Sequence, residues 1–185
     1  MKNNPNAKLF SVKQMVFCAL CMALCIVLPM AFHAIPNAGS VYSPIHIPVL
    51  LCGLICGPVL GAVCGAGGVL LSSLITGMPP MAMLPPMLVE CVTYGLLCGL
   101  GMRLVRTGKT TADLYISLAA AMIGGRIVSG IAKAFVFTPG AMSVQLWISG
   151  YFVTSLPGII LHLLLIPAVV LALYRARLLP ARYGA

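Results

Sequence analysis

Long apolar stretches alternate with short polar or glycine- and proline-rich breaks over most of this chain. A helix needs about 20 apolar residues to cross the roughly 30 Å hydrocarbon core of a bilayer, and six stretches reach or approach that length. They predict helices over residues 11–32, 46–57, 58–76, 82–104, 110–135 and 151–175. The expected fold class is therefore all-α, an integral membrane bundle of six transmembrane helices.

The second predicted helix, residues 46–57, is short for a full crossing. Either the preceding loop dips into the membrane or the helix boundary lies elsewhere. The end of this helix is better defined, at Gly57-Pro58. Proline lacks the amide proton that a continuous helix needs, and it disfavours a helical residue before it. We therefore expect the chain to reverse direction there.

Glycine recurs at every fourth position around this reversal, at Gly53, Gly57, Gly61 and Gly65. In lipid, apolar contact between helices gains nothing over contact with acyl chains. Small residues that let two backbones approach closely are what favours packing there. The helices on both sides of the reversal are therefore expected to pack tightly.

The composition excludes an ordinary soluble domain, because 61% of the 185 residues are apolar and only 7% are charged. We predict a single transmembrane domain over residues 1–185, with a six-helix bundle at 11–175 between cytoplasmic tails at 1–10 and 176–185. The formal charge of +9 does not indicate nucleic acid. Nine of the 11 lysines and arginines lie near the chain ends or in the loop at residues 103–109. This distribution predicts cytoplasmic termini and an even number of crossings, in contact with the lipid bilayer.

All eight cysteines lie within apolar stretches, and we interpret them as small buried apolar residues rather than a disulfide framework. Cys18 and Cys21 have CxxC spacing. However, no second CxxC or nearby histidine pair completes a site, and ligation normally needs four donors. No metal and no cofactor is predicted.

Charged side chains within membrane spans are costly and usually mark a pathway or a site. Glu90 lies 13 residues before Arg103, and Arg126 lies 13 residues after Asp113, on antiparallel helices. The two inner charges should therefore sit at similar depth, with Lys133 nearer the outer end. They either form a buried ion pair that pins two helices together, or one or both also reach a polar ligand.

Polar residues extend from these charges toward the outer face. Tyr94 follows Glu90 by four positions and Lys133 follows Arg126 by seven, so each helix presents a polar stripe. The outer loops at residues 33–44 and 137–150 could close over a molecule bound there. The predicted substrate-binding residues are Asn37, Tyr42, His46, Glu90, Tyr94, Arg126, Lys133, Gln145 and Trp147.

Several of these residue types have simpler explanations. Trp147 equally fits an interfacial anchor. His162, alone in the last predicted helix, fits a packing residue better than a proton relay. Ser72, Ser73 and Thr76 could extend a pocket, although hydroxyls in lipid more often bond their own backbone.

The sequence does not indicate an enzyme. Glu90 and Asp113 are the only acids and are expected at different depths, so paired general acid–base catalysis is implausible. Residues 108–111 resemble the end of a phosphate-binding loop, but Arg103 stands where its leading glycine should be and no strand precedes it. Any ATP-driven work would therefore require a partner.

Ala19 and Ala23 form an AxxxA pattern on the first helix, among large apolar neighbours. This shallow groove suits another helix. The partner helix lies either within the same chain or in a separate protein.

Taken together, the chain resembles the substrate-binding S components of energy-coupling factor (ECF) vitamin transporters of bacteria. The likeness rests on the small six-helix size, the AxxxA pattern and three further segments. These segments are HIPVLLCGLICGPVLGAVCG, PPMLVECVTYGLLCGL and MIGGRIVSGI.

The resemblance implies a protein of the bacterial cytoplasmic membrane that binds a vitamin-like substrate outside and associates with a coupling transmembrane protein and two ATPases. It implies that Ala19 and Ala23 contact the coupling protein, and that loops at residues 33–44 and 77–81 gate the pocket. The alternative is a stand-alone secondary transporter that uses Glu90 as its proton site.

Overall fold

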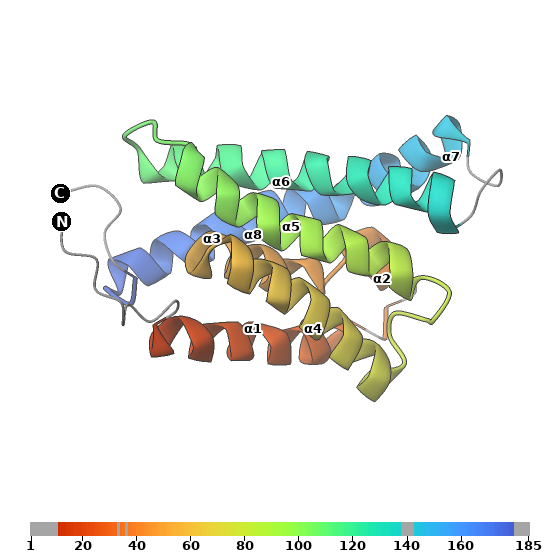
Figure 1. Ribbon diagram of the computed structural model, residues 1–185, viewed down its shortest axis with the longest axis horizontal. Coiled ribbons are helices and arrows are strands. Elements are labelled where there is room, and N and C mark those ends of the chain that lie inside the picture. Colours follow the sequence, from red (N-terminus) through yellow and green to blue (C-terminus); the bar gives the residue numbers. More distant parts are fainter. Residues whose placement is uncertain (1–10, 33, 36, 138–142, 180–185) are drawn as a thin grey trace.

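The computed structural model describes residues 11–32, 34–35, 37–137 and 143–179 (Figure 1). Within these residues the chain forms helices and no strand. The elements are, in order, α1 (Val12–Ala31), α2 (Ala38–Tyr42), α3 (His46–Cys56), α4 (Pro58–Thr76), α5 (Leu84–Leu104), α6 (Thr110–Ala132), η1 (Lys133–Phe137), α7 (Val144–Ile148), η2 (Ser149–Val153) and α8 (Leu156–Arg175). The predicted tail at residues 1–10 and most of the one at 176–185 lie outside the described residues.

Six helical segments of the described chain are long and apolar enough to cross a membrane. This confirms the prediction of an all-α bundle with six crossings. The segments are Val12–Ala31, Gly39–Cys56, Pro58–Thr76, Leu84–Leu104, Thr110–Phe137 and Leu156–Arg175.

The second crossing differs from the prediction because it is built from two helices. α3 has 11 residues and is only about 17 Å long at about 1.5 Å per residue. The short helix α2 precedes it, and both lie in the 18-residue, predominantly apolar segment Gly39–Cys56. Ser43, with a positive φ of 46°, ends α2 and separates the two. The expected loop at residues 33–44 is therefore partly helical.

The second expected loop, at residues 137–150, is also partly helical. The single-turn π-helix η1 continues α6 to Phe137, and α7 begins after Ser143, whose hydroxyl accepts a hydrogen bond from the Leu146 amide at 3.2 Å. The π-helix η2 then leads toward α8, which begins at Leu156 rather than at the predicted residue 151. Helices of one or two turns are too short to produce a recognisable hydrophobic period.

The start of α6 is anchored by Asp113, which lies in its first turn. The N-cap residue is Lys109 and makes no side-chain cap. Instead, the Asp113 carboxylate accepts hydrogen bonds from the amide of Thr107 at 2.9 Å and from its hydroxyl at 2.8 Å. The aspartate thus fixes the preceding loop.

The start of α1, the α5–α6 connection and the end of α8 lie at one end of the bundle (Figure 1). Arg103 lies in the last turn of α5, Arg106 and Lys109 lie in the connection, and Lys13 and Arg175 lie at the two helix ends. These five basic residues thus gather at one end, as an even number of crossings requires. α2, α7 and the α4–α5 turn lie at the opposite end (Figure 1).

The glycines of the predicted ladder bring α3, α4 and α5 into backbone contact. A Cβ atom on Gly53 or on Gly61 would lie 2.5 Å from the Gly95 carbonyl oxygen. Gly57, with a φ of 93°, makes the turn between α3 and α4, and Pro58 starts α4. Glycine is needed at Gly57 because other residues rarely adopt that backbone conformation. The backbones of the three helices therefore lie closer together than a Cβ atom at these glycine positions would permit.

α1 presents two different faces. Cys18, Cys21 and Cys25 are buried against α3 and α4, whereas Ala19 and Ala23 are exposed. In the described residues, the alanine groove therefore receives no helix from this chain. Of the two partners that the AxxxA pattern allowed, the internal one is not present.

Gly95→Ala should destabilise the bundle, because its Cβ would overlap the Gly61 backbone. Overpacking of this kind typically costs about 1–3 kcal/mol. We expect a lower thermal unfolding midpoint for the purified variant in detergent. Gly39→Ala is the matched control, because a Cβ there meets open space. Equal midpoints for the two variants would contradict the packing described above.

Candidate functional site

A cavity of about 1040 Å³ is lined by residues of α2, α7 and the α4–α5 turn. These elements lie at the end of the bundle opposite the α5–α6 connection (Figure 1). The cavity wall combines the end of α1, the segment from α2 to the start of α3, the α4–α5 turn and the first turns of α5, together with residues of α6, η1, α7 and η2. Most of these elements contribute apolar side chains, among them Phe32, Met83 and Met87. This volume fits a small organic molecule.

The polar floor of the cavity is formed by Glu90 and Arg126, which a third residue, Tyr94, joins from beneath, between α5 and α6. The Tyr94 hydroxyl donates a hydrogen bond to Glu90 Oε1 at 2.6 Å. The same hydroxyl oxygen accepts a hydrogen bond from Arg126 Nε at 3.1 Å. Tyr94 therefore links the two charges, which was not anticipated in the hypothesis of an ion pair. Glu90 and Arg126 both line the cavity.

His46 lies beside this network and has unused hydrogen-bonding capacity. Its ring packs edge-on against the Tyr94 ring, with centroids 5.0 Å apart. The side chain is only 5% exposed and lines the cavity, and among the described residues neither ring nitrogen has a hydrogen-bond partner. A buried polar group without a partner is costly, so a ligand that bonds His46 would recover that cost.

His162 of α8 packs behind His46, with ring centroids 6.1 Å apart. It is 1% exposed and does not line the cavity. This buried position outside the cavity wall fits a packing residue, and the choice between packing and a proton relay stays a prediction.

The α4–α5 turn is held onto α4 by the hydroxyls that were candidates for the pocket. The Ser72 hydroxyl donates to the Met78 carbonyl at 2.7 Å, and the Ser73 hydroxyl donates to the Pro79 carbonyl at 2.9 Å. Met78 and Pro79 line the cavity, whereas the two serines do not. The serines thus shape the wall by bonding backbone, in line with the general habit of hydroxyls in lipid.

On the opposite wall, η2 brings aromatic rings over α6. The Tyr151 hydroxyl lies 3.2 Å from the Ser129 hydroxyl, and burial raises the pKa of Tyr151 above its ordinary value. The Phe152 ring lies 5.5 Å from the Arg126 guanidinium carbon, within cation–π range. Tyr151 lines the cavity and remains protonated at neutral pH, so its hydroxyl keeps its proton as a donor.

The nine predicted substrate-binding residues do not all reach the cavity. Asn37, His46, Glu90, Arg126 and Lys133 line it. The remaining four, Tyr42, Tyr94, Gln145 and Trp147, are not part of its wall.

These four residues lie close by in different settings. Tyr94 forms the link beneath the floor, and Tyr42 packs against Phe32 with ring centroids 6.0 Å apart. Gln145 is exposed. Trp147 lies directly on Gly130, where a Cβ atom would overlap the indole, and its Nε1 donates to the Arg126 carbonyl at 3.4 Å. Trp147 therefore supports the backbone of α6.

Sequence reasoning did not single out Ser129 or Tyr151. Ser129 lies three residues after Arg126, on the same face of α6, so the polar stripe could have included it. Tyr151 was placed at the start of a transmembrane helix, where a tyrosine normally indicates an interfacial anchor.

Comparison with known families supports this architecture. The chain matches the model of a family described as "ECF transporter, substrate-specific component" over residues 13–170. A search of curated proteins found no match. The matched region covers all six candidate transmembrane segments almost completely. It leaves out only the first residue of α1 and the last turn or so of α8.

Tyr94→Phe should lower the stability of the protein, because it leaves Glu90 and Arg126 without the hydroxyl that bonds both. Unsatisfied buried groups cost about 1–3 kcal/mol, and more when they are charged. The expected result is a lower thermal unfolding midpoint in detergent. Tyr115→Phe, on the exposed side of α6, is the matched control and should leave the midpoint unchanged. The link would be disproved by a Tyr94→Phe variant as stable as this control.

Proposed function

We propose that this chain, which belongs to the family of ECF transporter substrate-specific components, binds a vitamin or related micronutrient in the outward cavity for ATP-driven uptake. It is a multi-pass membrane protein of a family of transport components, and the bacterial cytoplasmic membrane suits that family. The observation that carries the proposal is the cavity, whose apolar walls surround a buried polar floor. Such a combination is typical of small-molecule binding sites.

The floor favours an anionic or strongly polar ligand. Arg126 and Lys133 both line the cavity, and Glu90 is already engaged by Tyr94. A negatively charged ligand group would therefore meet cationic donors and the unused nitrogens of His46. Small carboxylic acids such as pantothenate fit this chemistry, and mass spectrometry of the molecule that co-purifies with the protein would identify the substrate.

We propose further that transport depends on partners, because the family that the chain matches is described as the substrate-specific component of a transporter. We propose that a coupling membrane protein docks on the exposed groove at Ala19 and Ala23, with two ATPases attached to it. Small exposed residues allow another helix to approach closely in lipid. The sequence has no phosphate-binding loop, which agrees with the proposal that separate ATPases, and not this chain, bind ATP.

Arg126→Ala should weaken binding of the co-purified ligand by about 10- to 150-fold, because a hydrogen bond to a charged group contributes about 1.5–3 kcal/mol. Isothermal titration calorimetry in detergent would measure the change. Arg106→Ala, in the exposed α5–α6 connection, is the matched control. If Arg126→Ala changes neither affinity nor thermal stability, Arg126 is not part of the site.

Ala19→Trp should leave ligand binding intact and abolish uptake, because the indole fills the groove that the partner needs. The measurement is uptake of the identified ligand into vesicles that contain the chain, the coupling protein, both ATPases and ATP. Leu164→Trp, on the exposed side of α8, is the control and should keep uptake. Robust uptake by the chain alone would overturn the dependence on partners and favour a secondary carrier.

A further inference from the structure

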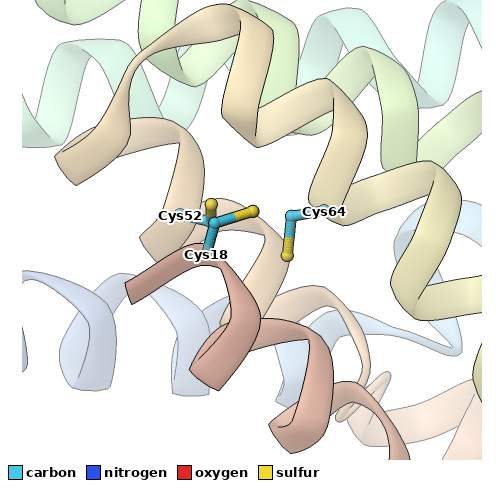
Figure 2. A group of neighbouring side chains, drawn as sticks. All are labelled: Cys18, Cys52 and Cys64. Atoms are coloured by element: carbon cyan, nitrogen blue, oxygen red, sulfur yellow. The ribbon is translucent and has the colours of Figure 1, made fainter. Parts of the chain in front are cut away.

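Three buried thiols from three different helices converge at a place that does not belong to the wall of the cavity. Cys18 comes from α1, Cys52 from α3 and Cys64 from α4, and Figure 2 shows their side chains gathered between these helices. Each sulfur lies within 4.8 Å of the other two. The exposed fractions are 4%, 0% and 0%. None of the three residues lines the cavity, so this thiol trio is independent of the proposed function.

We infer that the thiol trio is a binding site for trivalent arsenic, taken up as uncharged arsenous acid. The spacing suits a central atom with three sulfur ligands. Trivalent arsenic keeps a lone pair, so its three sulfur ligands form a pyramid; at a bond length of about 2.3 Å, the zinc–thiolate length, they lie about 3.5 Å apart. Since each sulfur of the trio lies within 4.8 Å of the other two, the trio would have to contract by up to about 1.3 Å.

Charge decides which thiophilic species fits. The Cys18 and Cys52 thiols point at the same acceptor, the Leu60 carbonyl oxygen, at 3.6 and 3.5 Å. A carbonyl oxygen cannot stabilise negative charge. Three thiolates around copper(I) would carry a net charge of minus two, and around zinc minus one, within a buried apolar setting where charge is expensive. A trivalent centre with three thiolates is neutral.

The binding reaction is a balanced exchange of ligands. Three As–O bonds of arsenous acid break and three As–S bonds form, and each thiol proton leaves with a hydroxide as water. Arsenic stays trivalent, so no oxidant or reductant is required. Arsenous acid is neutral at physiological pH, so no charge has to cross the apolar interior to reach the thiols.

Such a site would join α1 to α3 and α4 through one atom. The sequence could not indicate it, because the three cysteines are 34 and 12 positions apart and are recognisable as a group only when the helices are packed. Cys18 is adjacent to Ala19 in the sequence, but Cys18 is buried and Ala19 is exposed. Arsenic bound here would tie the helix that carries the alanine groove to the rest of the bundle.

The test is arsenite titration of the full-length protein, purified in reduced form in detergent. Native mass spectrometry should find one arsenic per chain, with three hydrogens lost. The three hydrogens lost count the thiols consumed in the folded protein, three of the eight that are free before arsenite is added. Arsenic X-ray absorption should show only sulfur neighbours, and the thermal unfolding midpoint should rise.

Cys52→Ala should abolish this behaviour, whereas Cys98→Ala, a buried cysteine of α5 outside the trio, should preserve it. Three results would overturn the inference: no arsenic retained by the wild-type protein, only two thiols consumed, or equal retention by Cys52→Ala. If Cys52→Ala does not fold, the thiol count and the absorption spectrum of the wild-type protein still decide the question.

Discussion

A single hydroxyl group allows this bundle to hold two opposite charges in its interior. Glu90 and Arg126 sit on neighbouring helices, and the hydroxyl of Tyr94 donates to one and accepts from the other. Without that shared partner, both groups would be left buried and poorly solvated, at a cost of several kcal/mol in a membrane. The α5–α6 pair, the cavity floor and the position of His46 against the Tyr94 ring all depend on it.

The helices that carry the polar floor are held in place by close backbone contacts, which glycines make possible. Because Gly53, Gly61 and Gly95 bring three backbones into contact, α5 is held in a defined position against α3 and α4. Glu90 and Tyr94 lie on that same α5. On the other side, Trp147 lies on Gly130 and fixes the α6 backbone near Arg126. Each charged residue is therefore positioned by close packing of a glycine nearby on its own helix.

Much of this arrangement was predictable from the sequence. Apolar length identifies the crossings, Pro58 marks the start of α4, and counting residues from the basic end places Glu90 and Arg126 at similar depth. Other features depend on tertiary contacts that no local pattern records. Helices α2 and α7 have five residues each, too few for a period. The approach of Tyr151 to Ser129 and the meeting of three cysteines depend on how distant helices are oriented.

The helix α3 is enclosed by its neighbours, since ten of its 11 residues are buried and it packs against α1, α4, α5, α6 and α8. Because such a helix does not contact acyl chains, its hydrophobic length does not have to match the thickness of the bilayer. Hydrophobic mismatch in a thinner or thicker membrane would therefore be absorbed by tilting of the outer helices, above all α1 and α8. The geometry around His46, at the start of α3, should consequently be insensitive to the lipid composition of the host membrane.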